Sequence, residues 1–224
     1  ELRNRRRGQA VRLEVDHDTP EELSHELLEK LELTEGDLYR INGPVNPIHL
    51  SGLLKGDHSP ELRDDHFVPA PAPVFRKRTD IFEVVRNQDV LLHHPYESFE
   101  CVVSLLEQAA ADPKVLAIKQ TLYRTGSDPR IAGALMRAAQ NGKQVAAVVE
   151  LKARFDEATN VQWAKQLERA GVHVVYGMVG LKTHSKVVLV VRDDGDKLRR
   201  YCHIGTGNYN AKTAKNYEDL GLLT

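Results

Sequence analysis

The sequence predicts an α/β protein: a mixed but mostly parallel sheet flanked by helices, preceded by a smaller helical and irregular segment. From residue 89 onward, short apolar runs rich in Val, Leu and Ile alternate with stretches whose apolar residues recur at helical spacing. Residues 69–73, PAPAP, mark the point where this alternation begins to replace an irregular pattern. We therefore expect two parts, a helical and irregular segment over residues 1–70 and an α/β unit over residues 71–224.

The first part contains one clear helix signal. Residues 19–22, TPEE, match a capping box with proline at the first helical position, which would open a helix to about Lys30. Residues 12–15 favour a short strand. The Asn, Gly and Pro content of residues 41–50, INGPVNPIHL, predicts a loop.

The second part alternates strands and helices. We expect strands at residues 89–94, 114–123, 144–151, 173–177, 186–191 and 199–207, and helices at 98–111, 131–140 and from 159 or 160 to 171. The dipeptides at 128–129 (DP) and 141–142 (NG) are typical of the start and end of the second helix. Residues 193–196, DDGD, predict a hairpin turn between the last two strands. This order implies a mostly parallel sheet with an antiparallel addition near its end.

The composition is that of a globular protein with a substantial core. Of 224 residues, 41% are hydrophobic and 28% are charged. No run approaches the roughly 20 apolar residues of a membrane span, and the basic N-terminus lacks the apolar stretch of a signal peptide. Two cysteines cannot build a disulfide framework. We therefore expect a reducing compartment, the cytoplasm, and leave association with a membrane surface open.

Charge is distributed unevenly along the chain. The formal net charge is −1, but residues 114–192 hold 13 Lys or Arg against 5 Asp or Glu, whereas residues 1–113 hold 13 against 22. A basic segment in a nearly neutral protein favours an anionic ligand at that segment. Pairing of surface charges between the two halves is the other interpretation, and charge alone leaves both open.

Cationic and phosphate-binding groups follow the predicted strands, where ligands collect in such sheets. They are Arg124, Arg154, Lys182, Lys186, Thr206 and Asn208, and His184 lies between the two lysines. Arginine offers paired donors to phosphate oxygens, and lysine offers a mobile charge. The backbone N–H groups of residues 205–208, GTGN, add neutral donors. Together these groups predict a polyanion site that contains a nucleophile, His184.

Plainer interpretations of the same residues remain. A His-x-Lys triplet is short enough to occur by chance, Arg124 and Arg154 could form surface ion pairs, and residues 205–208 could be only a turn. His93 and His94 are adjacent on a strand and point to opposite faces, so they predict one exposed and one buried imidazole rather than a metal pair. Cys101 is expected to be a core thiol.

Four stretches resemble the long polyphosphate kinase family, which is related to phospholipase D. They are HHPYESFECVVSLLEQAAADPKVLAIKQTLYR, VVELKARFDEATNVQWAKQLERAGVHVVYG, GLKTHSKVVLVVR and YCHIGTGNYNAKTAKNYEDL. The resemblance covers residues 89–224, and the first 70 or so residues are similar to the end of the family's helical head domain. It implies a phospholipase-D-like α/β half-domain.

The resemblance also implies a reaction and the residues that perform it. The family transfers the γ-phosphate of ATP reversibly to the end of a polyphosphate chain, through a phosphohistidine that matches His184. Its two arginines near magnesium and phosphate match Arg124 and Arg154, which would share phosphate oxygens with Mg²⁺ rather than ligate it. Its nucleotide-contacting tyrosine matches Tyr217. The resemblance also implies a homo-oligomer. Because the basic loops hold few aromatic residues on which bases could stack, we expect no nucleic-acid partner.

Two departures from the family pattern matter. The phospholipase D signature places an aspartate where this chain has Val191, which argues against phosphodiester hydrolysis. That superfamily also uses two half-domains face to face, so we expect this chain to be a piece of a longer protein and inactive by itself. A phospholipase-D-like phosphodiesterase and a non-catalytic polyanion-binding module are the alternative functions.

Overall fold

A computed structural model describes residues 8–53, 60–65, 67–126, 128–151, 153, 157–177 and 180–224. The chain divides into two compact units, Glu1–His66 and Phe67–Thr224, and each is described by itself. No helix in the described ranges has the length and apolar character needed to cross a membrane.

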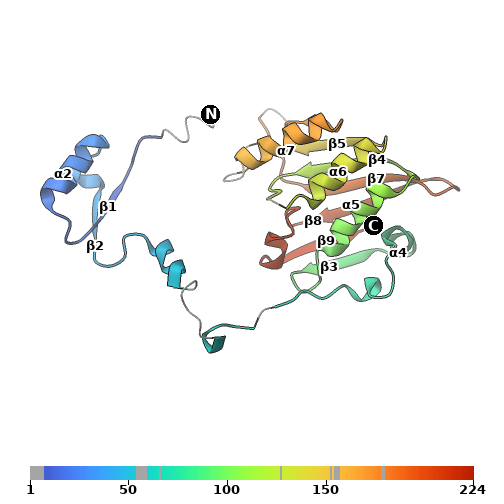
Figure 1. Cartoon of the computed structure of the whole chain (residues 1–224), viewed down its shortest axis with the longest axis horizontal. Coiled ribbons are helices and arrows are strands. Elements are labelled where there is room, and N and C mark those ends of the chain that lie inside the picture. Colours follow the sequence, from blue (N-terminus) through green and yellow to red (C-terminus); the bar gives the residue numbers. More distant parts are fainter. Residues whose placement is uncertain are drawn as a thin grey trace. The chain divides into compact units, whose positions relative to one another are not determined.

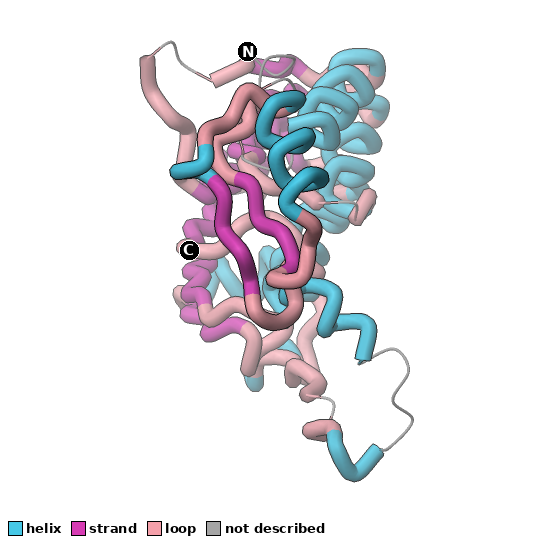
Figure 2. The backbone as a smooth tube through the Cα atoms, turned by 90° about the vertical axis from the view of Figure 1, so that its left-hand side faces the viewer, coloured by secondary structure: helices cyan, strands magenta, loops and turns pink. Residues whose placement is uncertain are grey.

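The first unit is a small β-α-β arrangement. Strand β1 (Leu13–Asp16) pairs in parallel with β2 (Leu38–Ile41), and helix α2 (Glu21–Lys30) connects them. Figure 2 shows the two strands side by side, with α2 next to them. The predicted helix and first strand are confirmed, but the predicted capping box is wrong, because Pro20 is the N-cap of α2 and no side chain caps it.

The second unit carries one sheet and four helices within the described residues (Figure 1). In chain order the elements are α4 (Ile81–Asn87), β3 (Val90–His94), α5 (Glu100–Ala111), β4 (Val115–Leu122), α6 (Arg130–Gln140), β5 (Gln144–Val149), α7 (Glu157–Arg169), β6 (His173–Val175), β7 (Lys186–Asp193), β8 (Leu198–Gly205) and β9 (Asp219–Leu223). The expected strands and helices are therefore present. Helix α4 and strand β9 were not predicted.

The sheet is mixed, and the prediction that it is mostly parallel is wrong. Its strand order is β3-β9-β8-β7-β4-β5-β6. Only the β4–β5 and β5–β6 pairs are parallel, and the other four pairs are antiparallel. The physical reason is the short connection from β6 to β7, residues 176–185, whose described residues, 176–177 and 180–185, contain no helix. A parallel strand needs a crossover, usually helical, that carries the chain back along the sheet. Strand β7 instead enters beside β4 in the opposite direction.

Helices cover one face of this sheet (Figure 1). On that face alternate strand residues are fully buried, among them Leu92, Ile118 and Val188, each 0% exposed. The opposite face carries half-exposed apolar side chains, such as Ile204 and Leu220 at 49% and 47%. The core of the unit therefore lies between the sheet and the helices α4, α5, α6 and α7.

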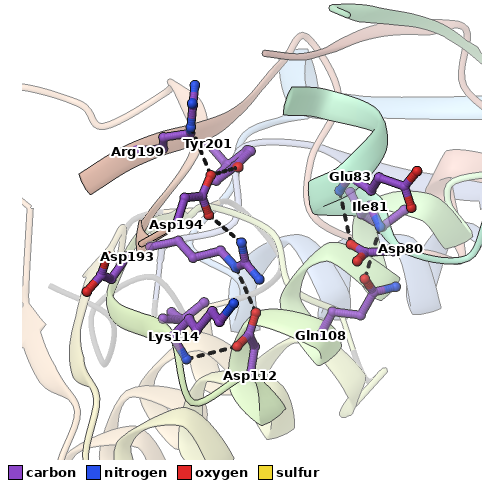
Figure 3. Close-up of polar contacts among 12 residues, drawn as sticks. Asp80, Ile81, Glu83, Gln108, Asp112, Lys114, Asp193, Asp194, Arg199 and Tyr201 are labelled. Atoms are coloured by element: carbon purple, nitrogen blue, oxygen red, sulfur yellow. Dashed lines mark hydrogen bonds and ion pairs between the residues drawn. The ribbon is translucent and has the colours of Figure 1, made fainter. Parts of the chain in front are cut away.

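The end of the sheet where β7 turns into β8 is held by a buried carboxylate, Asp194. Its side chain is 0% exposed and pairs with Arg192 and with the Arg199 Nε at 2.9 Å, and it accepts a hydrogen bond from the Tyr201 hydroxyl at 2.6 Å (Figure 3). It also pairs with the Arg86 Nη2 at 3.0 Å. The hairpin turn was predicted, but this network was not. We call it the Asp194 end of the sheet.

Helices α4 and α5 are tied to the same end. The Arg192 Nε donates to Asp112, just after α5, at 2.7 Å, and its guanidinium lies 5.0 Å from the ring centre of Phe82 in α4. Gln108 accepts a hydrogen bond from the backbone N–H of Ile81 at 3.0 Å, and Asp80 caps α4 (Figure 3). These polar contacts fix where the two helices begin and end against the sheet.

Candidate active site

His184 lies at the other end of the sheet, two residues before β7. This end, which we call the His184 end, contains the carboxyl ends of β4, β5 and β8 and the amino ends of β7 and β9. The antiparallel entry of β7 puts His184 before its strand rather than after it. The predicted site loops that the structure describes, those that carry Arg124, His184 and Thr206, nevertheless begin or end at this one end of the sheet.

The backbone on both sides of His184 is anchored to neighbouring strands. The Thr183 N–H donates to the Glu150 carboxylate, at the end of β5, at 2.9 Å. Thr121 in β4 donates through its hydroxyl to the Ser185 carbonyl at 2.8 Å and accepts from the Val187 N–H at 3.0 Å. Because the backbone is hydrogen-bonded both before and after His184, the His184 backbone has little freedom to move. The position of its imidazole is therefore restricted.

The side chains at this end gather around Tyr123, the residue that follows β4. Its ring is 7% exposed and meets the His184 imidazole edge to face, with ring centres 4.9 Å apart and planes at 79°. The ammonium nitrogens of Lys182 and Lys186 each lie 5.2 Å from the ring centre, and the Arg124 guanidinium carbon lies 5.9 Å from it. The structure therefore brings together four of the predicted site residues.

Burial and the neighbouring cations both favour the neutral form of the His184 imidazole. Partial burial lowers the pKa of His184 below its ordinary value, and the charges of Lys186, Lys182 and Arg124 lower it further. Burial also lowers the pKa of Lys186, which is 5% exposed and donates to the His184 carbonyl at 2.6 Å. A neutral imidazole retains the nitrogen lone pair that a nucleophile needs.

A buried asparagine, Asn160, clamps the ends of two strands beneath this site. It is 0% exposed, and its amide nitrogen donates to the carbonyls of Tyr123 at 2.5 Å and Glu150 at 2.9 Å. Its amide oxygen accepts from the Thr125 hydroxyl at 3.2 Å. Sequence reasoning offered Asn160 as a helix start, whereas α7 begins at Glu157 and Asn160 lies inside it. The available signal for this role was that Asn160 is a polar residue at a position of the helix where an apolar residue would be expected.

Three further predicted site residues, Thr206, Asn208 and Tyr217, lie in the loop between β8 and β9. The Thr206 hydroxyl donates to Asp219 at 2.8 Å and accepts from the Leu220 N–H at 3.0 Å. Asn208 is half-buried, and within the described residues its amide oxygen has no hydrogen-bond partner. Tyr217 is 62% exposed. Arg154 lies outside the described residues. Asp219 connects this group to the first one, because its charge opposes the lowering of the Lys186 pKa.

Comparison with known proteins shows to which family this chain belongs. Residues 80–224 match the family described as "Polyphosphate kinase C-terminal domain 1", and residues 1–53 match "Polyphosphate kinase middle domain". The chain belongs to the polyphosphate kinase family. It is 55% identical to the polyphosphate kinase of Mycolicibacterium gilvum (strain PYR-GCK) and 53% identical to that of Parasynechococcus marenigrum (strain WH8102).

The similarity extends over the whole of this chain but over only part of each relative. The two alignments cover 100% of the chain and 31% and 34% of the relatives. The crystal structure of polyphosphate kinase from Porphyromonas gingivalis superposes with a TM-score of 0.76 at 32% identity, covering 95% of this chain and 32% of that one. The chain thus spans about a third of the length of the polyphosphate kinases that it matches.

Magnesium is implied by the family, but the described donors around His184 do not form a resident site for it. Mg²⁺ prefers carboxylate, phosphate and water oxygens in octahedral geometry. Among the residues that the structure describes, no three His, Cys, Asp or Glu side chains are grouped so that they could hold a metal ion. The groups nearest His184 are ammonium and guanidinium groups, which are not ligands for a cation. We therefore treat magnesium as part of the nucleotide substrate.

Two buried histidines lie beneath the loop that carries Thr206 and Asn208. His94 is 3% exposed and His203 2%, and the His203 Nδ1 is 2.9 Å from the Tyr209 hydroxyl. A β-carbon on Gly221 would lie 2.7 Å from one imidazole Nε2 and 3.4 Å from the other, so a side chain at this position has no room. His93, on the outer face, is exposed, which confirms the prediction of one buried and one exposed imidazole in this pair.

Stability of this unit is expected to fall as the pH drops below about 6.5. Burial and the neighbouring His94 lower the pKa of His203 to about 4. Between pH 6.5 and 4 the His203 imidazole is therefore protonated in the unfolded chain but neutral in the folded chain. This difference in bound protons favours unfolding. From pH 7.5 to 5 the loss should be roughly 2 kcal/mol.

Urea unfolding of the 224-residue chain, followed by the fluorescence of Trp163, its one tryptophan, measures this loss. The His203→Gln variant should lose the extra pH dependence, whereas His173→Gln, at an exposed position in β6, should keep it. Equal pH dependence in wild type and His203→Gln would contradict the prediction.

Proposed function

We propose that this chain is the part of a polyphosphate kinase that forms the phosphoenzyme. His184 attacks the γ-phosphorus of ATP in line, a P–N bond forms, and the bond to the bridging oxygen breaks, so that ADP leaves. The other ring nitrogen keeps its proton. The phosphoryl group then passes to the terminal phosphate of a polyphosphate chain. Both steps are close to thermoneutral, because a phosphoramidate resembles a phosphoanhydride in transfer potential.

The observation that supports this proposal most directly is an exposed neutral imidazole among three cations. Phosphoryl transfer leaves a protein little to do beyond positioning and charge neutralisation. His184 supplies the nucleophile, and Lys182, Lys186 and Arg124, grouped around Tyr123, supply positive charge for the equatorial oxygens. Val191 stands where the phospholipase D signature has an aspartate, which favours transfer over hydrolysis.

The other predicted residues take supporting roles in this proposal. Arg154 would share phosphate oxygens with the magnesium that the nucleotide brings, beside Arg124. Asn208 would donate to a phosphate through its amide group. For Thr206 to do so, its hydroxyl must leave Asp219, to which it now donates at 2.8 Å. Tyr217, whose ring is exposed, would contact the nucleotide.

The wider arrangement is also a proposal. Residues 1–70 would be the end of a head domain, and residues 71–224 a phospholipase-D-like half-domain whose site is completed by a second half of the protein. We expect the whole enzyme to be a homo-oligomer that binds MgATP and polyphosphate. Cys101 and Cys202 are both unpaired, which is compatible with the reducing cytoplasm where ATP is abundant.

The Arg124→Ala variant of the full-length enzyme is expected to turn over about 10²-fold more slowly, because a guanidinium aimed at developing charge acts mainly in the transition state. Steady-state rates at saturating ATP and polyphosphate measure this. Arg169→Ala, at an exposed position in the last turn of α7, is the matched control and should leave the rate unchanged. A near-normal rate for Arg124→Ala would remove Arg124 from the mechanism.

Incubation of the full-length enzyme with γ-labelled MgATP tests the proposed function. The expected result is one label per chain that is labile in acid and stable in base, and that mass spectrometry finds on the peptide containing His184. Addition of polyphosphate should discharge the label into longer chains. An unlabelled enzyme that still binds polyphosphate would show instead a polyanion-binding module.

A further inference from the structure

We propose that Tyr123 is a positioning residue whose ring holds the His184 imidazole and the surrounding cations in place before substrate arrives. This inference rests on the proposed function, since it assigns Tyr123 a part in phosphorylation of His184. Sequence reasoning passed over Tyr123 as the last residue of a strand.

The position of the Tyr123 ring is restricted by its backbone and by its burial. Tyr123 follows β4 directly, and its carbonyl accepts a hydrogen bond of 2.5 Å from the buried Asn160. Its side chain is 7% exposed. A buried aromatic side chain on a clamped backbone has few rotamers open to it. Tyr123 therefore has the rigidity that a support for a reacting group needs.

The contact with His184 restrains the imidazole directly. The two rings meet edge to face, with centres 4.9 Å apart and planes at 79°, which is a preferred geometry for aromatic pairs. Without this neighbour the exposed imidazole could rotate about its side-chain bonds. Displacement of a reacting group by about 1 Å can cost 10²-fold in rate.

The Tyr123 ring also attracts three cationic side chains that would otherwise move apart. Lys182, Lys186 and Arg124 repel one another, yet all three have their charged groups within 5.2–5.9 Å of the Tyr123 ring centre. The negative face of an aromatic ring attracts cations at such distances. The ring thus offsets part of this repulsion while no phosphate is bound, and it keeps the cations close to His184.

The ring makes these contacts, and the hydroxyl does not. Within the described part of the chain, the structure gives the Tyr123 hydroxyl no hydrogen-bond partner, whereas four side chains meet the ring. Phenylalanine at this position should therefore preserve the function. Methionine, which is of similar size but has no aromatic face, should not.

The test compares phosphoenzyme formation in full-length wild type, Tyr123→Phe, Tyr123→Met and His184→Gln by rapid mixing with γ-labelled MgATP. Tyr123→Met should form the label about 10- to 100-fold more slowly but to the full extent. Tyr123→Phe should match wild type, and His184→Gln should form none. The rate constant belongs to folded molecules only, so partial unfolding of Tyr123→Met would lower the extent and leave the rate unchanged.

A pH profile of the same rate separates positioning from a general loss of structure. In Tyr123→Met the imidazole gains water and the cations can move away, so the acid limb of the profile should shift to higher pH. The charged groups that face or adjoin His184 are otherwise unchanged in this variant: Lys182, Lys186 and Arg124 around the ring, Glu150 behind Thr183, and Asp219 beside Lys186.

The possible outcomes are distinct. A wild-type rate and acid limb in Tyr123→Met, or a lowered extent at an unchanged rate, would overturn the positioning role. A Tyr123→Phe variant as slow as Tyr123→Met would assign the effect to the hydroxyl and overturn it as well. If wild type takes up no label, or His184→Gln takes up as much, the proposed function itself fails.

Discussion

Replacement of His184 by glutamine in the full-length enzyme is expected to lower turnover by about 10⁴-fold or more, in both directions of the reaction. A carboxamide has the size of an imidazole but no lone pair basic enough to accept a phosphoryl group. Both half-reactions pass through the same P–N bond, so synthesis and breakdown of polyphosphate must fail together. Coupled assays of ADP release and of ATP formation from polyphosphate measure the two directions.

The matched control is His173→Gln. His173 is exposed at the start of β6, away from the cations that surround His184, and its replacement should leave both rates within a factor of two or so. Substantial turnover in His184→Gln would place the nucleophile elsewhere and reduce His184 to a substrate contact. Loss of one direction only would be incompatible with a shared phosphohistidine.

Replacement of Asp194 by asparagine is expected to weaken the sheet at its other end by about 3–5 kcal/mol. Burial works against the charged form of Asp194, but the Tyr201 hydroxyl and Arg192 outweigh it, so the pKa of Asp194 lies below its ordinary value. Loss of the carboxylate charge leaves Arg192, 11% exposed, with Asp112 as its one remaining ionic partner among the described residues. A buried cation short of countercharge is the costly part of such a change.

Native-state hydrogen exchange resolves this effect locally. Protection of amides in α4 and in the β7–β8 hairpin should fall by that amount in Asp194→Asn. Asp196→Asn, on the same turn but 61% exposed at its side chain and paired with Arg199 at 3.0 Å, should change protection by less than about 1 kcal/mol. Equal losses of amide protection in the two variants would mean that burial of Asp194 does not increase its contribution to stability.

Sequence alone predicted the part of the site that depends on residue type and position. Polar and cationic residues directly after or before apolar runs must lie at the ends of strands, which is why Arg124, Lys182, His184 and Lys186 could be grouped in advance. It could not predict Tyr123, Asn160 or Glu150 as members of the group. An aromatic residue, an amide inside a helix and a carboxylate after a strand are ordinary in any α/β protein, and only their neighbours in space distinguish them.

The errors in the fold have a similar origin. Apolar runs identify strands but carry no sign of direction, so the number of parallel pairs was inferred from the alternation with helices. The short connection before Lys186 was the feature that should have indicated reversal. Strand β9, DLGLL, was missed because a glycine interrupts a run of only five residues. That glycine is the position where two buried imidazoles leave no room for a side chain.

Strand β7 constrains how this protein can change in length. Lys186 and Arg192 lie six residues apart on the same buried face of that strand, one beside the nucleophile and one in the ion network about 20 Å away. Deletion or insertion of a single residue between them would turn one of the two to the opposite face. A change in the length of this strand would therefore impair either phosphoryl transfer or folding. Changes of length should be confined to the loops, where neither requirement applies.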